Sequence, residues 1–192
     1  KTPLFFARNN KLLGIIAVAD TIKKDSPQAI RELQNMGIRV VMITGDNERS
    51  AKAIGKLAGV DEVIAGVLPE GKEKEIARLK EQGSVIMVGD GINDSPALSA
   101  ADVGIAISDG AELAREIADI TIGADDLNVM VTLKEISNGL MDKIHKNYRR
   151  IVGINGSLIA LGVTGVIQPT MSALLHNTST LLIGMDSMKS VL

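Results

Sequence analysis

The sequence has no cysteine and no tryptophan, and it contains one tyrosine and two phenylalanines among 192 residues. Without cysteine, disulfide bonds, thiolate nucleophiles and cysteine-based zinc sites are excluded. With so few aromatic side chains, a platform on which nucleic-acid bases stack is not expected. The net charge is −2, so there is no basic field to attract nucleic acid either.

Apolar residues make up 45% of the chain, and they are unevenly distributed. As far as Ile122, short apolar runs such as 38–44 and 84–88 alternate with amphipathic segments. Continuous apolar strands that alternate with helices predict a parallel sheet covered by helices. The expected fold class is therefore α/β, with a Rossmann-like parallel sheet and helices on both faces. In such sheets the ligand site lies at the carboxyl ends of the strands.

Two carboxylates lie close together in the segment VGDGINDSPAL, at the end of the apolar run 84–88. Asp90 and Asp94 are four residues apart among glycines, and like charges in one pocket destabilise each other. A cation that neutralises both removes this cost, and a set of carboxylate oxygens suits Mg²⁺. The alternative is a solvated turn in which both acids cap a helix, but it explains the glycines and Asn93 less well.

Two other segments offer groups that bind phosphate. Thr44, in MITGDN, follows an apolar strand and offers a hydroxyl and backbone N–H groups. Lys72, in LPEGK, lies near the start of a helix, where its ammonium group can neutralise a phosphoryl oxygen. The alternative is a solvated surface lysine, which is the interpretation we favour for Lys74 and Lys80. Thr44, Lys72 and the two aspartates together predict a site for phosphate and magnesium.

After Asp126 the pattern changes to long helical segments. Residues 151–168 contain no charged side chain, and the length of this segment is at the lower end for a transmembrane helix. A second apolar segment follows Pro169. The basic residues before the first segment are Lys143, Lys146, Arg149 and Arg150. Because such a flank is typical of the cytoplasmic side, we expect a transmembrane helical hairpin, with helices at about 147–168 and 170–190. The alternative is a buried pair of core helices.

The set of Thr, Lys and two Asp at strand ends resembles the haloacid-dehalogenase-like superfamily. More closely, MITGDN, LPEGK and VGDGINDSPAL resemble three signature segments of P-type ATPases, in the same order. VADTIKKDSPQAI resembles a further segment, in which these pumps carry an Asp, here Asp20. The resemblance covers essentially the whole chain, and it implies an enzyme that hydrolyses ATP through an aspartyl-phosphate and moves an ion.

The resemblance also implies roles for individual residues. Thr44 and Lys72 would hold the phosphoryl group, Asp90 would bind Mg²⁺, and Asp94 would support both the metal and the phosphorylated Asp. The catalytic residues would then be Thr44, Lys72 and Asp94. The residues implied to lie at the nucleotide and phosphate are Thr44, Gly45, Asp46, Asn47, Lys72 and Asn93.

The family's phosphorylated Asp lies in a D-K-T-G-T segment, which this sequence does not contain. The resemblance therefore implies the carboxyl-terminal portion of a pump that would not turn over ATP by itself. Residues 1–10 would be the last strand of a mostly missing nucleotide-binding domain, 11–127 the phosphorylation domain and 128–192 the membrane domain. Its partners would be the lipid bilayer and the missing amino-terminal part, with the actuator domain and other helices. It would be a multi-pass protein of the cell membrane, with its soluble part in the cytoplasm.

Two helices directly after the phosphorylation domain resemble the heavy-metal-transporting pumps. Copper pumps usually carry a Tyr-Asn pair and a Met followed by Ser-Ser, whereas this sequence has Ile154-Asn155 and His176 followed by Ser179-Thr180. Imidazole in place of a thioether favours Zn²⁺, Co²⁺, Fe²⁺, Mn²⁺ or Ni²⁺ over Cu⁺. His176 and Asn155 are therefore candidate ligands of the transported ion. The alternative for His176 is a role in helix packing.

Three other functions remain open at this point. One is a copper-exporting pump of the same family. Another is a soluble haloacid-dehalogenase-like phosphatase, which predicts its own nucleophilic Asp motif and no membrane segment. A third is a non-catalytic partner of a pump with a degenerate phosphorylation domain, which the intact Thr44, Lys72, Asp90 and Asp94 make less favourable.

Overall fold

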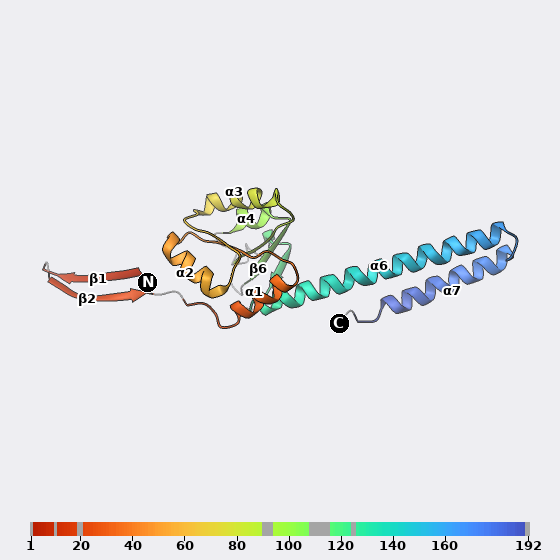
Figure 1. Cartoon of the computed structure of the whole chain (residues 1–192), viewed down its shortest axis with the longest axis horizontal. Helices are drawn as coiled ribbons and strands as arrows, with labels where there is room; N and C mark the ends of the chain where they lie inside the picture. Colours follow the sequence, from red (N-terminus) through yellow and green to blue (C-terminus); the bar gives the residue numbers. More distant parts are fainter. Residues whose placement is uncertain are drawn as a thin grey trace. The chain divides into compact units, whose positions relative to one another are not determined.

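The computed structural model describes residues 2–9, 11–18, 21–89, 94–107, 116–123 and 126–190. Asp20, Asp90 and Asn93 lie outside these residues. The chain forms two compact units, Lys1–Val131 and Thr132–Leu192. In chain order (Figure 1) the elements are β1 (Thr2–Arg8), β2 (Lys11–Val18), α1 (Ser26–Asn35), β3 (Val41–Ile43), α2 (Glu48–Ala58), β4 (Glu62–Ile64), α3 (Pro69–Lys80), β5 (Ile86–Gly89), α4 (Ser95–Ala100), β6 (Val103–Ile107), β7 (Ile120–Ile122), α6 (Asn128–Val163) and α7 (Pro169–Ser187).

The first two strands form an antiparallel ribbon, with Thr2 opposite Val18. Neighbouring residues of a strand point to opposite faces, and both Phe5 and Phe6 are exposed, to 65% and 47%. The ribbon is therefore apolar on both faces, and an isolated strand pair of this kind is only marginally stable in water. Residues 11–18, which the sequence assigned to the phosphorylation domain, pair here with β1.

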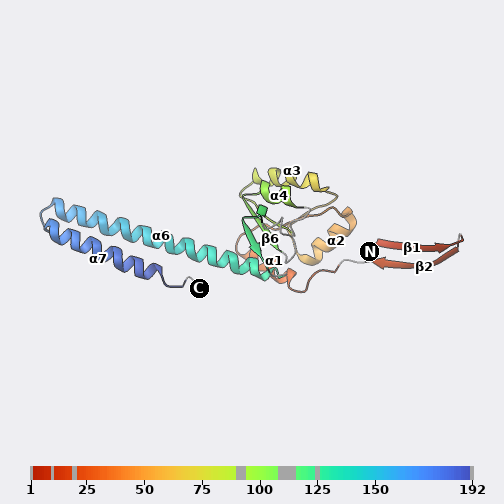
Figure 2. The same ribbon diagram turned by 180° about the vertical axis from the view of Figure 1, so that it is seen from behind.

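The remaining described strands form two parallel sheets. β3 pairs with β4, and a three-stranded sheet has the order β5-β6-β7. Helices connect most of these strands along the chain, so the predicted α/β fold with parallel pairing is confirmed. Helices α3 and α4 lie side by side (Figures 1 and 2) and pack against each other.

A buried core lies where α3, β5 and α4 meet. Its members are Ile76, Met87, Ala97 and Leu98. Ile43, the last residue of β3, packs against the same cluster. Gly104 in β6 allows α4 to approach closely, because a Cβ at this position would lie 2.7 Å from the carbonyl oxygen of Leu98. The core thus holds the first turns of α3 and α4 beside the end of β5.

Aspartates tie the parallel strands together at their amino ends. Asp61, directly before β4, accepts a hydrogen bond from the backbone N–H of Val40 at 2.7 Å. Asp102, directly before β6, accepts one from Val85 at 2.8 Å, and Asp119 before β7 accepts one from β6 at 2.8 Å. These backbone hydrogen bonds are the main reason why the pKa values of Asp61 and Asp102 lie below the usual value. Each carboxylate fixes the register of one strand pair.

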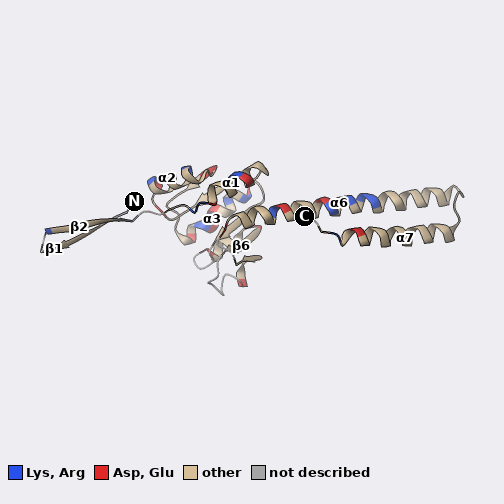
Figure 3. Cartoon of the chain, turned by 90° about the horizontal axis from the view of Figure 1, so that it is seen from below, with Lys and Arg blue, Asp and Glu red and all other residues tan. Residues whose placement is uncertain are grey.

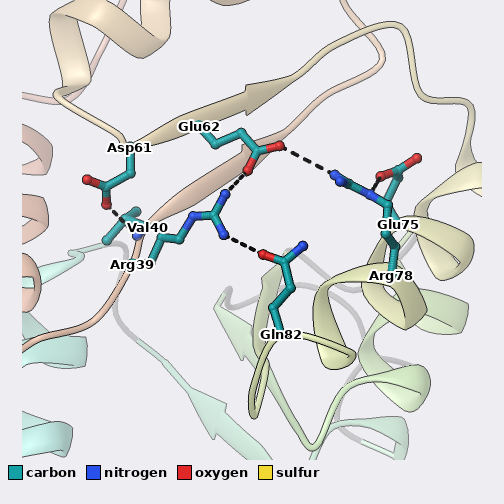
Figure 4. A network of polar contacts seen from close by, with 7 residues as sticks. All are labelled: Arg39, Val40, Asp61, Glu62, Glu75, Arg78 and Gln82. Carbon is teal, nitrogen blue, oxygen red and sulfur yellow. Dashed lines mark hydrogen bonds and ion pairs between the residues drawn. The ribbon is translucent and has the colours of Figure 1, made fainter.

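A network of exposed polar contacts lies at the same ends of β3 and β4 (Figure 4). Glu62, the first residue of β4, pairs with both Arg39 and Arg78. Arg39 also donates to Gln82 at 2.6 Å, and Arg78 to Glu75 at 2.9 Å. The charged side chains are 29% to 51% exposed, so each pair alone contributes little. The network joins the end of α3 to β4, away from the carboxyl ends of the strands.

The two helices of the hairpin, α6 and α7, begin and end at residues that differ from those predicted from the sequence. α6 is one continuous helix from Asn128 to Val163 and α7 runs from Pro169 to Ser187, whereas the sequence predicted membrane helices at about 147–168 and 170–190. α6 ends before Gly165, which adopts a positive φ of 73°, a common way to terminate a helix. Among the described residues, we find no helix with the length and apolar character needed to cross a membrane.

The lowered pKa values of Asp61 and Asp102 predict that acid destabilises the first unit. A carboxyl group with a lower pKa in the folded state stabilises that state above its unfolded pKa of about 3.9 and loses this effect as the pH falls through the folded pKa. We therefore expect the Tm to fall between about pH 5 and about pH 2. The double variant Asp61→Asn/Asp102→Asn should flatten this dependence, as measured by circular dichroism.

The matched control is Glu81→Gln, because Glu81 is exposed and its side chain has no hydrogen-bond partner among the residues described. This variant should keep the pH dependence of the unmodified chain. An equally steep loss of Tm in the double aspartate variant would contradict a stabilising role for the two carboxylates.

Candidate functional site

Thr44 lies directly after β3, in a loop that two backbone hydrogen bonds tie to the exit of β4. Its N–H donates to the carbonyl oxygen of Ile64 at 2.9 Å, and its own carbonyl accepts from Val67 at 3.0 Å. The hydroxyl oxygen of Thr44 accepts from the N–H of Asp46 at 3.1 Å. The side chain is half-buried and remains able to donate its hydroxyl proton. The position of the hydroxyl at the strand end is thus fixed by the backbone around it.

The residues after Thr44 form an exposed turn that leads into α2. The backbone carbonyl oxygen of Asp46 accepts a hydrogen bond from the N–H of Gly66 at 2.9 Å. The side chain of Asn47 caps α2, because its Oδ1 accepts from the N–H of Ser50 at 3.0 Å. The structure therefore gives Asn47 a structural role at the helix start. Gly45, Asp46 and Asn47 remain predictions as nucleotide contacts.

Lys72 and Asp94 form an ion pair, with 2.5 Å between Nζ and Oδ1. Lys72 lies in the first turn of α3 and Asp94 directly precedes α4, so the packing of the two helices brings the side chains together. The two side chains are only 16% and 13% exposed. Such a pair is held in a partly water-excluded position, where charge interactions are stronger than at the surface.

The strand end beneath Asp94 is shaped to accept its carboxylate. A Cβ at Gly89, the last residue of β5, would lie 2.7 Å from Oδ2 of Asp94. Because glycine has no side chain, there is room for the carboxylate of Asp94 over the end of the strand. Sequence reasoning did not give Gly89 this role, although its position directly before Asp90 in the GDGIND segment was a usable signal.

Asp94 is the predicted magnesium ligand that the structure describes. Asp94 offers carboxylate oxygens above Gly89, and hard oxygen ligands are what Mg²⁺ prefers. The other predicted ligand, Asp90, and the predicted contact Asn93 belong to the part of the chain that is not described. Among the described residues, no group of three or more His, Cys, Asp and Glu side chains lies together.

The second unit brings together the two candidate ligands of a transported ion. Nδ1 of His176 in α7 lies 2.9 Å from Oδ1 of Asn155 in α6. In the tautomer whose Nδ1 carries the proton, Nδ1 donates to this oxygen and the lone pair of Nε2 is available to a metal ion. Asn155 then orients the imidazole, as partners of metal-binding histidines commonly do. Ser179 and Thr180 both donate to the backbone oxygen of His176, at 2.8 Å and 2.9 Å.

Residues 2–102 match the family model of the haloacid dehalogenase-like hydrolases, which is more than half of the chain. The chain belongs to this family. Among curated relatives, the copper-exporting P-type ATPase of Staphylococcus epidermidis is 44% identical over 98% of this chain and 24% of its own length. The copper-transporting ATPase 2 of Rhizobium meliloti is 45% identical over 91% of this chain and 21% of its own length.

Among solved structures, a zinc-transporting PIB-type ATPase in its E2.Pi state is similar over 94% of this chain and 30% of its own, with a TM-score of 0.86 and 36% identity. The resemblance to heavy-metal P-type ATPases is thereby confirmed. The chain spans about a quarter of the length of the curated relatives named here. It is thus homologous to one portion of much longer proteins.

The position of Lys72 and Asp94 predicts an energetic coupling between them. Lys72→Met should lower the free energy of unfolding by about 2 kcal/mol, because it leaves Asp94 as an unpaired, poorly hydrated charge. In a double-mutant cycle with Asp94→Asn, we expect a coupling of about 1–2 kcal/mol by urea unfolding.

The pair Lys52 and Glu48 is a matched control, with a similar separation of 2.6 Å but exposures of 67% and 73%. Its cycle, made with Lys52→Met and Glu48→Gln, should give a much smaller coupling, because both side chains are exposed to water. Equal couplings for the two pairs would show that burial adds nothing to the contact between Lys72 and Asp94.

Proposed function

We propose that this chain is the phosphoryl-handling and ion-path portion of an ATP-driven pump for a transition-metal cation. The observation that carries the proposal is the ion pair of Lys72 and Asp94 over the end of β5. A homologue of P-type ATPases that places a lysine and a carboxylate at this point has the groups needed to hold a phosphoryl oxygen and a metal ion. Thr44, fixed at the end of β3, supplies a third group.

Each residue has a distinct task in this proposal. The ammonium group of Lys72 neutralises one phosphoryl oxygen, and the hydroxyl of Thr44 donates a hydrogen bond to another. Asp90 and Asp94 would hold Mg²⁺, which would offset the negative charge of the phosphate. Asp94 also keeps the ammonium group of Lys72 in position while the site is free of phosphate.

The phosphorylated Asp comes from the missing part of the pump in this proposal. Its carboxylate oxygen attacks the γ-phosphorus of ATP, the bond to the β-phosphate oxygen breaks, and ADP leaves. The residues of this chain orient and neutralise the group that is transferred. In this proposal, the chain does not form the aspartyl-phosphate by itself.

The hairpin of α6 and α7 is proposed to lie in the membrane as part of the ion path. No Asp, Glu, Lys or Arg occurs from Ile151 to Met185, and apolar side chains on both helices are exposed, for example Leu174 at 60% and Leu182 at 60%. On a helix in a membrane such side chains contact lipid instead of water, so their exposure has no hydrophobic cost. α7 alone has 19 residues, which corresponds to about 28 Å of helix.

We propose a divalent ion as the cargo, one of Zn²⁺, Co²⁺, Fe²⁺, Mn²⁺ or Ni²⁺. An imidazole that keeps Nε2 free, oriented by Asn155, is a borderline ligand that suits these ions better than Cu⁺. The zinc-transporting relative of known structure supports this choice. The second candidate is Cu⁺, and it is favoured by the names of the curated relatives.

Two variants of the pump that contains this chain test the function, and each is a control for the other. Asp90→Asn should abolish the phosphoenzyme formed from ATP, because one ligand of the magnesium ion is lost. His176→Ala should leave phosphorylation by inorganic phosphate intact but lower the stimulation of ATP hydrolysis by Zn²⁺ or Co²⁺ by about tenfold or more. Radioactive phosphate incorporation and metal-dependent ATPase assays give the two measurements.

Normal phosphoenzyme levels in Asp90→Asn would contradict the phosphoryl site. Full stimulation by Cu⁺ together with an unaffected His176→Ala variant would show that the copper alternative is correct and that His176 is a packing residue.

The membrane location predicts the accessibility of two single-cysteine variants. The introduced thiol is the only one in the chain, because the sequence has no native cysteine. Thr170→Cys, next to the turn of the hairpin, should react with an impermeant thiol reagent added outside intact cells. Ser190→Cys, beyond the other end of α7, should react only after the membrane is permeabilised. The reverse pattern would overturn the orientation, and reaction of both in intact cells would argue against a membrane-spanning hairpin.

A further inference from the structure

One face of α6 carries a row of polar side chains where the uncharged segment begins. Each of Lys143, Lys146, Asn147 and Arg150 is three or four residues from two others of this set, so the four lie on the same side of the helix. After Arg150, no Asp, Glu, Lys or Arg occurs until Asp186 in α7. In Figure 3, the stretch of α6 whose ribbon is coloured blue at Lys and Arg is followed by tan helix as far as the turn. The row therefore marks the border between a charged and an apolar part of the hairpin.

The middle of α6 and the carboxyl end of α7 with the residues after it line a groove at this border. Its volume is about 450 Å³. The charged side chains that line it are Lys143, Lys146, Arg150, Lys189, Asp142 and Asp186. Four positive charges against two negative ones leave a net charge of +2 in the groove.

The contacts within the groove show where the excess positive charge lies. Asp186 is shared by two cations, with 2.7 Å to Arg150 and 2.8 Å to Lys189. The ammonium group of Lys143 donates to the backbone oxygen of Lys189. Lys146 has no hydrogen-bond or ion-pair partner among the residues that the structure describes. Its ammonium group is thus available for an anion that enters the groove.

We propose that this groove binds the phosphodiester headgroup of an anionic phospholipid, an inference that rests on the membrane location of the hairpin proposed above. A phosphodiester carries one negative charge and accepts several hydrogen bonds, which the ammonium groups of Lys146 and Lys143 can donate. Basic pockets between helices on the cytoplasmic side of a membrane are a setting in which anionic headgroups bind.

Exposed apolar side chains next to the groove favour a lipid over free phosphate. Ile151 and Val152 follow directly after Arg150 in α6 and are 43% and 52% exposed. A headgroup held by Lys146 would place its acyl chains along this apolar part of the hairpin. Inorganic phosphate shares the charge of the headgroup but gains nothing from these side chains.

Native mass spectrometry of the chain released from nanodiscs tests the proposal. The nanodiscs contain phosphatidylcholine with a minor fraction of phosphatidylglycerol, and the measured quantity is the phosphatidylglycerol retained per chain. Lys146→Ala should lower this retention about fivefold, and Lys146→Arg should restore most of it. The matched control is Arg149→Ala, because Arg149 carries the same charge in the same turn of α6 but does not line the groove. It should retain phosphatidylglycerol like the unmodified chain.

Equal losses in Lys146→Ala and Arg149→Ala would indicate a diffuse attraction to the membrane surface and would overturn the site. Displacement of phosphatidylglycerol by an equal concentration of inorganic phosphate would identify a phosphate site and overturn the lipid. If the chain enters pure phosphatidylcholine nanodiscs and shows no preference for phosphatidylglycerol, the lipid site is overturned but the membrane location is not. Failure to enter either membrane would contradict the membrane location and, with it, this inference.

Discussion

The ion pair of Lys72 and Asp94 is the interaction on which the candidate site depends. Both side chains are largely buried, and either charge alone would lose more hydration than it regains. The site therefore forms only when α3 and α4 are packed side by side, as the core below them requires. Gly89 and Gly104 make this packing possible, since a side chain at either position would collide with Asp94 or with the backbone of α4. The glycines, the core and the ion pair thus form one structural unit.

Much of this first unit could be predicted from the sequence, because strand ends and helix starts leave local signals. Thr44 after an apolar run and Lys72 after a proline were found in this way, and the structure places both where strands end or helices begin. The aspartates that tie the strands together were not found. Asp61 and Asp102 look like ordinary turn residues until the neighbouring strand is present, since their partners lie 21 and 17 residues away. The pairing of β2 with β1 was missed for the same reason, because strand pairing is not a local property.

The boundaries of the hairpin show a different limit of sequence reasoning. The sequence predicted a membrane helix that begins at about residue 147, but charged side chains do not interrupt a helix. Nothing between Asn128 and Val163 removes a backbone hydrogen bond, so α6 continues through both parts. Its end is set by Gly165, and the start of α7 by Pro169. By contrast, His176 and Asn155 were named as a pair from the resemblance alone, and the structure places them in contact.

The two clusters of charge differ in balance, and this difference determines what each can bind. The charges of Lys72 and Asp94 neutralise each other. A phosphoryl group can therefore pair with the ammonium group of Lys72 only if another cation neutralises Asp94. A magnesium ion at Asp94 and Asp90 would do so, which couples the binding of metal and phosphate at that site. Around Asp186 the cations are in excess, and Lys146 is already without a partner among the described residues. An anion can therefore enter that groove without any exchange of partners and without a metal ion.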